Sequence, residues 1–259
     1  MTVWPPPRRL MLGLALAGMV AAGSAQALAQ AQATSVCPAV PALPTLPVEA
    51  IPAPVPVPYW NQRVQELDKI ISSTDLARVK LLFLGDSITQ IWDPQVFQRY
   101  YGQRAALNMG VASDTTQGML WRLGRSPLGQ QLKPQLVVLM IGTNNAHNPK
   151  TEEVAFGIAQ TIRLIRQRVP ESKILLIGIL PRGATTQDWF RTPVAKINGL
   201  IASCADQQHI FFVDPGASLL DSDGNLSERM AADRLHLSAA GYSILSAAIE
   251  PSVRALLGH

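Results

Sequence analysis

Residues 136–145 read LVVLMIGTNN, an apolar run that ends abruptly in a glycine, a hydroxyl and two amides. A run of this length without alternating polar residues is typical of a strand in a parallel sheet, because helices cover both faces of such a sheet. Four other short apolar runs have the same character. The sequence therefore predicts five buried parallel strands, at Leu81–Leu84, Ala105–Met109, Leu136–Ile141, Ile174–Leu180 and Ile210–Val213.

Helical stretches are predicted between these strands. The clearest is Thr151–Val169, where aliphatic side chains recur on one stripe of the helix. The other helices are predicted near Tyr59–Ser73, Ile88–Tyr100, Thr115–Leu123, Phe190–Gln207 and Ser238–Leu257. Strands and helices alternate, which predicts a three-layer α/β/α domain over residues 59–259. Ligands of such domains bind beyond the carboxyl ends of the strands, so functional residues are expected directly after each strand.

The first 33 residues differ from this domain and are expected to be a signal peptide. A stretch whose only charges are Arg8 and Arg9 is followed by 13 uncharged, mostly apolar residues, Leu10–Ala22, and then by Ala-x-Ala sites that end between Ala27 and Ala33. This layout is typical of export and implies a periplasmic or secreted protein. The alternative is a membrane anchor, but a spanning helix needs about 20 apolar residues.

Residues 34–58 are expected to be a proline-rich linker. Pro38 to Pro58 holds eight prolines in 21 residues, which favours an extended backbone. Such a segment is either a spacer or a chain that wraps over the domain. Cys37 at its start and Cys204 in the domain either form a disulfide, which an oxidising compartment permits, or remain two free thiols.

The charge balance limits the classes of partner. The chain carries 22 basic and 18 acidic residues, a net charge of +4 at pH 7. Cleavage after Ala33 would remove Arg8 and Arg9 and leave 20 basic against 18 acidic residues. No run of one sign remains, so neither nucleic acid nor an anionic membrane surface is expected as a partner. Stable membrane insertion is not expected after cleavage.

Polar residues follow the predicted strands, as this architecture requires. Ser87 lies in the stretch GDSIT, residues 85–89, where a strand gives way to a helix that offers unpaired N–H groups. Gly110 follows the second strand and Asn144 the third, and each could donate an N–H group to a developing oxyanion. Taken singly, these residues are also explained as a helix cap, a turn glycine and an asparagine that holds a loop.

The fourth piece precedes the last predicted helix. Asp233 and His236 are three residues apart. In a turn, this spacing lets the carboxylate accept from one imidazole nitrogen while the other nitrogen faces Ser87. The alternative is a polar turn with an exposed histidine. Among the other histidines, His147 is the only rival base, and no acidic residue lies close to it in the sequence, so His236 is the predicted base.

In order, the four pieces resemble the sequence blocks of the GDSL or SGNH hydrolase family. They read Gly85-Asp86-Ser87, Gly110, Gly142-Thr143-Asn144 and Asp233 to His236. The resemblance spans roughly residues 81–257. It is strongest to the catalytic subunits of the intracellular platelet-activating-factor acetylhydrolase, with matching stretches at 114–116, 120–123, 142–145 and 180–183. It implies a flavodoxin-like sheet of five parallel strands, no metal cofactor and a small-molecule ester as substrate.

The resemblance also implies roles for individual residues. Ser87 would attack the ester, His236 would relay the proton and Asp233 would orient His236. The donors of an oxyanion hole are expected at Ser87, Gly110 and Asn144. The walls of a shallow acyl pocket, which would bind the substrate, are expected at Ile88, Thr143 and Leu235.

The sequence departs from the family at several points. Ser113 stands where related enzymes usually carry a second glycine, and Asn145 replaces the aspartate of the wider family's GxND pattern. The acetylhydrolase branch is cytosolic, whereas this chain begins with an export-type leader, so lipid-mediator chemistry is not carried over. The segments Leu180–Ala184 and Gln187–Phe190 either rim the site or form an ordinary loop and helix start.

The prediction is an exported serine esterase that hydrolyses short-chain, acetyl-type esters. One alternative is a lysophospholipase or thioesterase that acts on longer acyl chains. The other is a non-catalytic binding module that uses the proline-rich segment as a tether. The resemblance further suggests a homodimer.

Overall fold

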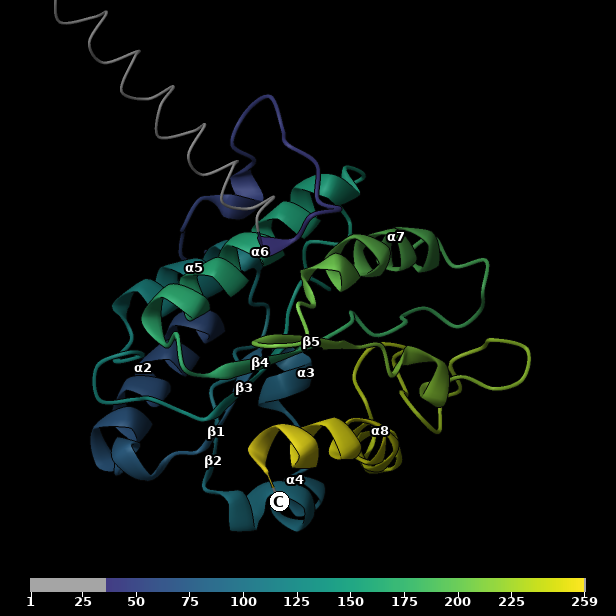
Figure 1. Ribbon diagram of the computed structural model, residues 1–259. Coiled ribbons are helices and arrows are strands. Elements are labelled where there is room, and N and C mark those ends of the chain that lie inside the picture. The colour runs from purple at the N-terminus through teal and green to yellow at the C-terminus, as the bar shows by residue number, and fades with distance from the viewer. Residues whose placement is uncertain (1–35, 259) are drawn as a thin grey trace, which may run out of the picture.

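The computed structural model describes residues 36–258, so the expected signal peptide lies outside the described residues. Five parallel strands form one sheet in the order β2-β1-β3-β4-β5 (Figure 1). They are β1 (Leu81–Gly85), β2 (Ala106–Asn108), β3 (Leu136–Met140), β4 (Lys173–Ile177) and β5 (Ile210–Val213). The expected α/β fold with five parallel strands is confirmed.

Helices cover both faces of this sheet (Figure 1). One face carries α5 (Thr116–Arg125), α6 (Thr151–Arg168) and α7 (Arg191–Ile201), with α2 (Pro58–Ser73) beside them; the other carries α3 (Ser87–Gln90), α4 (Pro94–Tyr101) and α8 (Ala239–Leu257). Short 3-10 helices lie at Val48–Ala50, Leu76–Arg78, Gly102–Arg104, Ala202–Cys204 and Gly216–Leu219.

Alternate strand residues divide between two apolar cores. In β1, Leu82 and Leu84 pack into the core that contains α6, whereas Leu81 and Phe83 pack into the core that contains α8. Every residue of β1 and β3 is buried. Both faces of these central strands therefore lack water, which explains why their sequences are apolar throughout.

The single helix predicted near Ile88–Tyr100 is wrong, because the chain forms two helices there. The Asp93 carboxylate accepts the N–H groups of Gln95 and Val96 at 3.0 and 2.9 Å and caps α4, and Pro94 is the first residue of that helix. Proline disfavours the helical conformation in the residue before it, so the chain must leave α3 before Asp93.

Several predicted ends also differ. β4 ends at Ile177 rather than Leu180, and α7 gives way at Ala202 to a 3-10 turn that ends at Cys204 rather than Gln207. β2 begins at Ala106, because Ala105 has a left-handed backbone with φ 47°.

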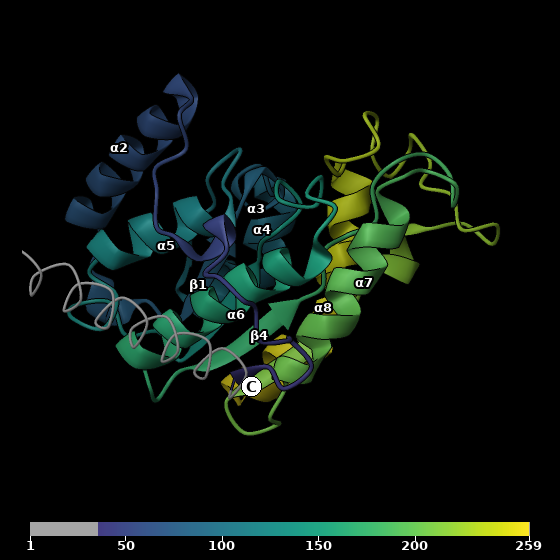
Figure 2. The same ribbon diagram turned by 90° about the horizontal axis from the view of Figure 1, so that it is seen from above.

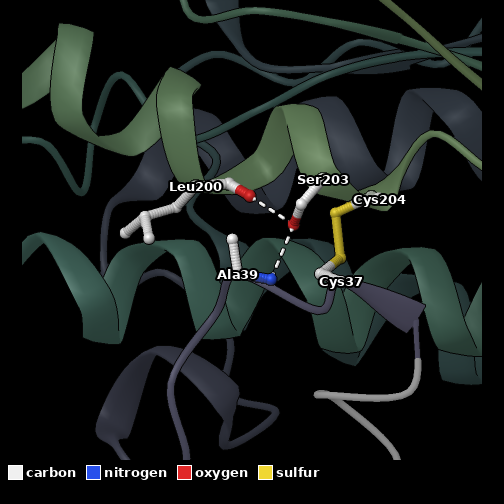
Figure 3. The surroundings of a disulfide bond; sticks show 5 residues. All are labelled: Cys37, Ala39, Leu200, Ser203 and Cys204. Carbon is white, nitrogen blue, oxygen red and sulfur yellow. Dashed lines mark hydrogen bonds between the residues drawn. A yellow bond between two sulfur atoms is a disulfide. The ribbon is translucent and has the colours of Figure 1, made fainter.

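Residues 36–57, which we call the strap, wrap over the domain instead of leading away from it. In Figure 2 this purple segment runs along α6 toward α2. Cys37 forms a disulfide with Cys204, the last residue of the 3-10 turn that follows α7 (Figure 3). Beside the disulfide, the Ala39 N–H donates to Ser203 Oγ at 3.0 Å. The segment is therefore a chain that wraps over the domain and not a spacer. Cys37 and Cys204 form a disulfide and are not two free thiols.

No helix among residues 36–258 is both long enough and apolar enough to cross a membrane.

Candidate active site

Ser87 lies at the carboxyl end of the sheet, at the first residue of α3. Its strand, β1, ends at Gly85, which is level with Met140 of the neighbouring β3. Gly85 lies so close to α3 that a Cβ there would be 2.0 Å from Thr89 Oγ1, so no larger residue fits. Asp86, between strand and helix, accepts the Ile88 N–H at 2.9 Å and caps the helix. The turn that presents Ser87 is thus fixed by its own neighbours.

The structure brings Ser87, His236 and Asp233 into one hydrogen-bonded chain. His236 Nε2 lies 2.9 Å from Ser87 Oγ, and His236 Nδ1 lies 2.6 Å from Asp233 Oδ2. The other carboxylate oxygen of Asp233 accepts the backbone N–H groups of Leu235 and His236 at 3.0 and 2.7 Å. The loop before α8 therefore holds both the acid and the ring, and it aims the ring at Ser87 from a position 149 residues away in the sequence.

These contacts decide the charge state of Asp233. Partial burial raises the pKa of the Asp233 carboxyl, but the hydrogen bonds that it accepts from the His236 ring and from the two backbone N–H groups outweigh that effect, and the pKa lies below its usual value. Asp233 is therefore ionised near neutral pH, as a group that orients an imidazole must be.

Asp86 next to the serine has the opposite environment. It is 1% exposed, and burial raises its pKa to about 7, against the Ile88 hydrogen bond that lowers it. The carboxylate of Asp114 raises the pKa of Asp86 further. The pKa of Asp86 is thus raised and that of Asp233 lowered, although both acids belong to the same site. Of the two, Asp233 is the one that contacts the imidazole.

The expected oxyanion donors differ in whether their N–H groups already have an acceptor. The side-chain amide of Asn144 donates one hydrogen to the Asp114 carbonyl at 2.8 Å and has a second hydrogen to give. The Gly110 N–H donates to Asn108 Oδ1 at 2.8 Å, so it already has an acceptor. Gly110 itself packs against α3, where a Cβ would lie 2.3 Å from the backbone nitrogen of Gln90.

A buried ion pair supports this side of the site and was not predicted. Arg122 Nε donates to Asp114 Oδ2 at 2.7 Å, and the other oxygen of Asp114 accepts from Trp60 Nε1 at 3.0 Å. Arg122 also donates to the Gly85 carbonyl at the end of β1. The network ties α2 and α5 to the end of β1, two residues before Ser87. No local motif reveals it, because Trp60 and Asp114 are 54 residues apart.

The first turns of α2 reach the same loop. Tyr59 Oη lies 2.6 Å from Ser113 Oγ, and Arg63 Nε donates to the Gly110 carbonyl at 3.2 Å. Ser113 has φ 62°, a left-handed conformation that a serine adopts at some cost. The residue that departs from the family pattern is therefore held by a tyrosine from a helix outside the predicted motifs.

Two of the three expected wall residues lie together. Ile88 and Thr143 are buried and border one closed crevice, which is too small for a water molecule and is not lined by Ser87. The crevice is otherwise lined by Asp86, Met140, Ile141, Ile179 and Leu180. Leu235 is half-buried against the α8 core and is not among the residues that line the crevice.

The loop after β4 lies beside the site, in keeping with a rim. Arg182 Nη1 donates to the Thr143 carbonyl at 3.2 Å, and the Gly183 N–H donates to the Arg234 carbonyl at 3.0 Å. The loop therefore spans from the Asn144 turn to the Asp233 turn.

Comparison with known proteins identifies the family. A model of the GDSL-like lipase/acylhydrolase family matches residues 83–244. Among similar proteins, the platelet-activating factor acetylhydrolase IB subunit alpha2 of Homo sapiens is 35% identical over 179 residues, which are 68% of this chain and 77% of that protein. The alpha1 subunit of Bos taurus is 32% identical over 180 residues, 69% of this chain and 76% of that protein. The chain belongs to the GDSL-like lipase/acylhydrolase family.

Solved structures of other GDSL and esterase proteins share the fold. A GDSL-like lipase from Bacteroides thetaiotaomicron matches with TM-score 0.58 and 21% identity, over 76% of this chain and 97% of that chain. Axe2, an acetylxylan esterase from Geobacillus stearothermophilus, matches with TM-score 0.53 and 21% identity, over 72% and 97%. The predicted membership of the GDSL family is thus confirmed, and the protein is a hydrolase.

Proposed function

We propose that this GDSL-family hydrolase is an exported serine esterase that cleaves short-chain, acetyl-type esters through Ser87, His236 and Asp233. The observation that carries the proposal is the hydrogen-bonded chain of these three side chains, with 2.9 and 2.6 Å between their atoms. A serine, an imidazole that accepts its proton and a carboxylate that fixes the imidazole are the parts that acyl transfer to serine requires.

In the proposed reaction, Ser87 Oγ attacks the ester carbonyl carbon while its proton passes to His236 Nε2. Asp233 holds the Nδ1–H of the ring and stabilises the imidazolium that forms. The tetrahedral intermediate collapses, and His236 protonates the departing alcohol. A water molecule then attacks the acyl-Ser87 ester with His236 again as base, which releases the carboxylic acid and restores the serine.

The negative oxygen of the intermediate needs N–H donors in fixed positions. We assign this role to the backbone N–H of Ser87 and the side-chain amide of Asn144. Gly110 joins them once its N–H leaves the Asn108 side chain, which holds it at 2.8 Å in the structure. Each such donor is worth about 3 kcal/mol in the transition state.

The preference for a small acyl group is supported by Ile88 and Thr143, the chain neighbours of Ser87 and Asn144, which are buried and pack without opening a chamber for a long acyl chain. The alcohol side is open, since the His236 side chain is 35% and the Asp233 side chain 55% exposed. A bulky acyl acceptor therefore fits better than a long acyl chain, and acetylated carbohydrates belong to this class of ester.

Export is supported by the Cys37–Cys204 disulfide, because disulfides persist in oxidising compartments. Mass spectrometry of the protein recovered from the periplasm or the medium should find an N-terminus between residues 28 and 34. Recovery of the uncleaved chain in the cytoplasm alone would contradict export.

The enzyme activity is tested with p-nitrophenyl acetate. Ser87→Ala should lower kcat by about 10⁴-fold or more, because no other group replaces the nucleophile. Ser218→Ala, which alters an exposed serine, should leave kcat unchanged. Activity that survives in Ser87→Ala would overturn the assignment.

Two further measurements separate the alternatives. Esters from acetyl to palmitoyl test the acyl length, and a preference for long chains would favour a lysophospholipase or thioesterase. A fluorophosphonate probe tests the nucleophile itself. Absence of label on Ser87 in the wild-type protein would favour a non-catalytic binding module.

A further inference from the structure

The strap contains one charged residue, Glu49, and the fold buries it. Glu49 is the only charged residue between residues 10 and 58. It lies in the 3-10 turn Val48–Ala50 and is 4% exposed, while its neighbour Val48 is 59% exposed. Burying a carboxyl group costs free energy unless the group has partners, so the contacts that Glu49 makes must be specific.

Glu49 contacts two loops of the site with two of its oxygens. Its side-chain Oε1 accepts from Asn148 Nδ2 at 2.7 Å. Its backbone carbonyl accepts from Thr116 Oγ1, also at 2.7 Å. Asn148 belongs to the turn that follows β3, and Thr116 is the first residue of α5. One residue of the strap thus joins the turn that carries Asn144 to the start of α5.

The two loops are in turn joined at Asn144. The Thr116 N–H donates to Asn145 Oδ1 at 3.0 Å, and Asn144 Nδ2 donates to the Asp114 carbonyl at 2.8 Å. The position of the Asn144 amide therefore depends on both loops, and both loops are fixed to Glu49.

The helix beneath is shaped for this contact. Where the strap crosses α6, the helix carries Gly157, and a Cβ there would lie 2.6 Å from the Glu49 carbonyl and 2.7 Å from Thr116 Oγ1. A glycine costs helix stability of up to about 1 kcal/mol. Only a glycine lets Glu49 and Thr116 meet over α6.

We propose that Glu49 is a positioning residue for the esterase reaction: it fixes the Asn144 side-chain amide as an oxyanion donor by tying the turn after β3 to the start of α5. The inference rests on the proposed function. Glu49 does not touch the reacting atoms. It acts through Asn148 and Thr116, and the Cys37–Cys204 disulfide and α2 hold the strap on either side of it.

The test measures kcat and KM for p-nitrophenyl acetate in Glu49→Ala, Glu49→Gln and the control Val48→Ala. Glu49→Ala should lower kcat about tenfold with KM within about twofold, because a displaced oxyanion donor affects the transition state rather than substrate binding. Glu49→Gln keeps an amide oxygen that can accept from Asn148 and should stay within about twofold of the wild type. Val48→Ala should match the wild type.

A double-mutant cycle with Asn144→Ala distinguishes positioning from a general loss of structure. If Glu49 acts through Asn144, Glu49→Ala should lower kcat no further in the Asn144→Ala background. Each variant is compared by thermal melting, so that kcat is measured well below its unfolding transition.

The outcomes separate the inference from the proposed function. An active wild type with an equally active Glu49→Ala variant would overturn the inference alone, as would a tenfold loss that persists in full in Asn144→Ala. A wild type without Ser87-dependent activity would overturn the proposed function, and the inference with it.

Discussion

The strand-end loops and the strap meet beside Asn144. The loop before α8 keeps its polar groups near water, with the Asp233 side chain 55% and the His236 side chain 35% exposed. The strap buries its one charged residue to 4% exposure and presents valines and prolines instead. In the loops a contact such as Asp233–His236 spans three residues, whereas Glu49 reaches Asn148 over 99 residues and Cys37 reaches Cys204 over 167.

This difference distinguishes the residues proposed to react from the residues that hold the loops in place. The groups proposed to react are close in sequence to the turns that hold them, so short spacings such as DxxH reveal them. The groups that hold the loops in place act across the fold. Changes in the first region should therefore lower activity without lowering stability. Changes in the second should lower stability, and they should lower activity only at Glu49, whose contacts reach the Asn144 turn.

After loss of the nucleophile itself, the largest effect is expected from Asp233→Asn, which should lower kcat/KM about 10³- to 10⁴-fold. An asparagine oxygen can still accept the N–H groups of Leu235 and His236, so the turn keeps its shape, but the amide cannot stabilise the imidazolium. Kinetics with p-nitrophenyl acetate and urea unfolding should be measured on the same sample.

The matched control is Asp221→Asn. Asp221 also accepts two backbone N–H groups, those of Asp223 and Asn225, in an exposed turn. The Asp221→Asn variant should keep kcat/KM within about twofold of the wild-type value. A large drop in unfolding free energy for Asp233→Asn would show that the catalytic turn is also a structural support, and the division between the two regions would fail.

The next effect tests the strap. Replacing both Cys37 and Cys204 by serine should lower the unfolding free energy by about 2–4 kcal/mol, because the disulfide closes a long loop in the unfolded chain. The folded variant keeps the hydrogen bonds of Glu49, so kcat at 25 °C should stay within about twofold. Urea unfolding and kinetics check the two values.

Ser203→Ala is the control for the disulfide variant. It removes the hydrogen bonds that Ser203 Oγ accepts from the Ala39 N–H and donates to the Leu200 carbonyl, leaves the disulfide in place, and should cost about 1 kcal/mol. A tenfold loss of kcat in the folded double-serine variant would mean that the tether sets the geometry of the site from its far end.

The sequence located the residues proposed to react better than their surroundings. The five strands were readable because each is a short, mostly apolar run, and the central β1 and β3 are buried throughout. Ser87, Asn144 and the Asp233–His236 pair each follow a strand or precede the last helix. Their catalytic roles stay predictions. The Trp60–Asp114–Arg122 network and the contacts of Glu49 could not be read, because their members are ordinary residues in separate segments.

Some features were readable and were missed. Pro94 marks a helix start, and the preceding aspartate is a standard cap, so the break between α3 and α4 had a local signal. Asn108 lies two residues before Gly110, a spacing that favours the Asx turn in which the Gly110 N–H is held.

A smaller effect, on the pH dependence of stability, is expected at Asp86. This residue belongs to the site but is buried, as Glu49 of the strap is. Its pKa of about 7 lies above the usual value of 3.8, so the folded state binds the proton more tightly than the unfolded chain. That contribution to stability is fully present below pH 4 and is lost as the pH rises through 7. Asp86→Asn, which keeps the cap acceptor, should gain roughly 1–3 kcal/mol relative to the wild type between pH 4.5 and pH 8.

Urea unfolding at the two pH values measures this gain. Asp93→Asn is the matched control, since Asp93 caps the next helix through the Gln95 and Val96 N–H groups and is less buried. A stability difference between Asp86→Asn and the wild type that is the same at both pH values would show that Asp86 is ionised in the folded protein throughout this range.

The smallest effect is expected at the exposed rim. The Trp189 side chain is among the exposed large hydrophobic groups, at 55%, and stacks on Phe190 with 3.8 Å between ring centroids. Phe190 in turn lies under the Arg182 guanidinium at 3.6 Å, and Arg182 donates to the Thr143 carbonyl beside Asn144. If the acyl acceptor is a carbohydrate, as proposed above, Trp189 is the exposed aromatic side chain of this rim that would stack on a sugar ring. Trp189→Ala should raise KM for an acetylated xylooligosaccharide about three- to fivefold, or roughly 1 kcal/mol, and leave p-nitrophenyl acetate unaffected.

The control for Trp189→Ala is Ile51→Ala, which removes an exposed apolar side chain from the strap and should alter neither substrate. The comparison of two substrates matters more than the size of the loss. The acetyl group and the reacting atoms are the same in both, so only a contact to the acceptor can change one KM and not the other. Equal losses on both substrates would mean that Trp189 supports the loop after β4, and the rim would then belong with the strap, as support, rather than with the residues that meet the substrate.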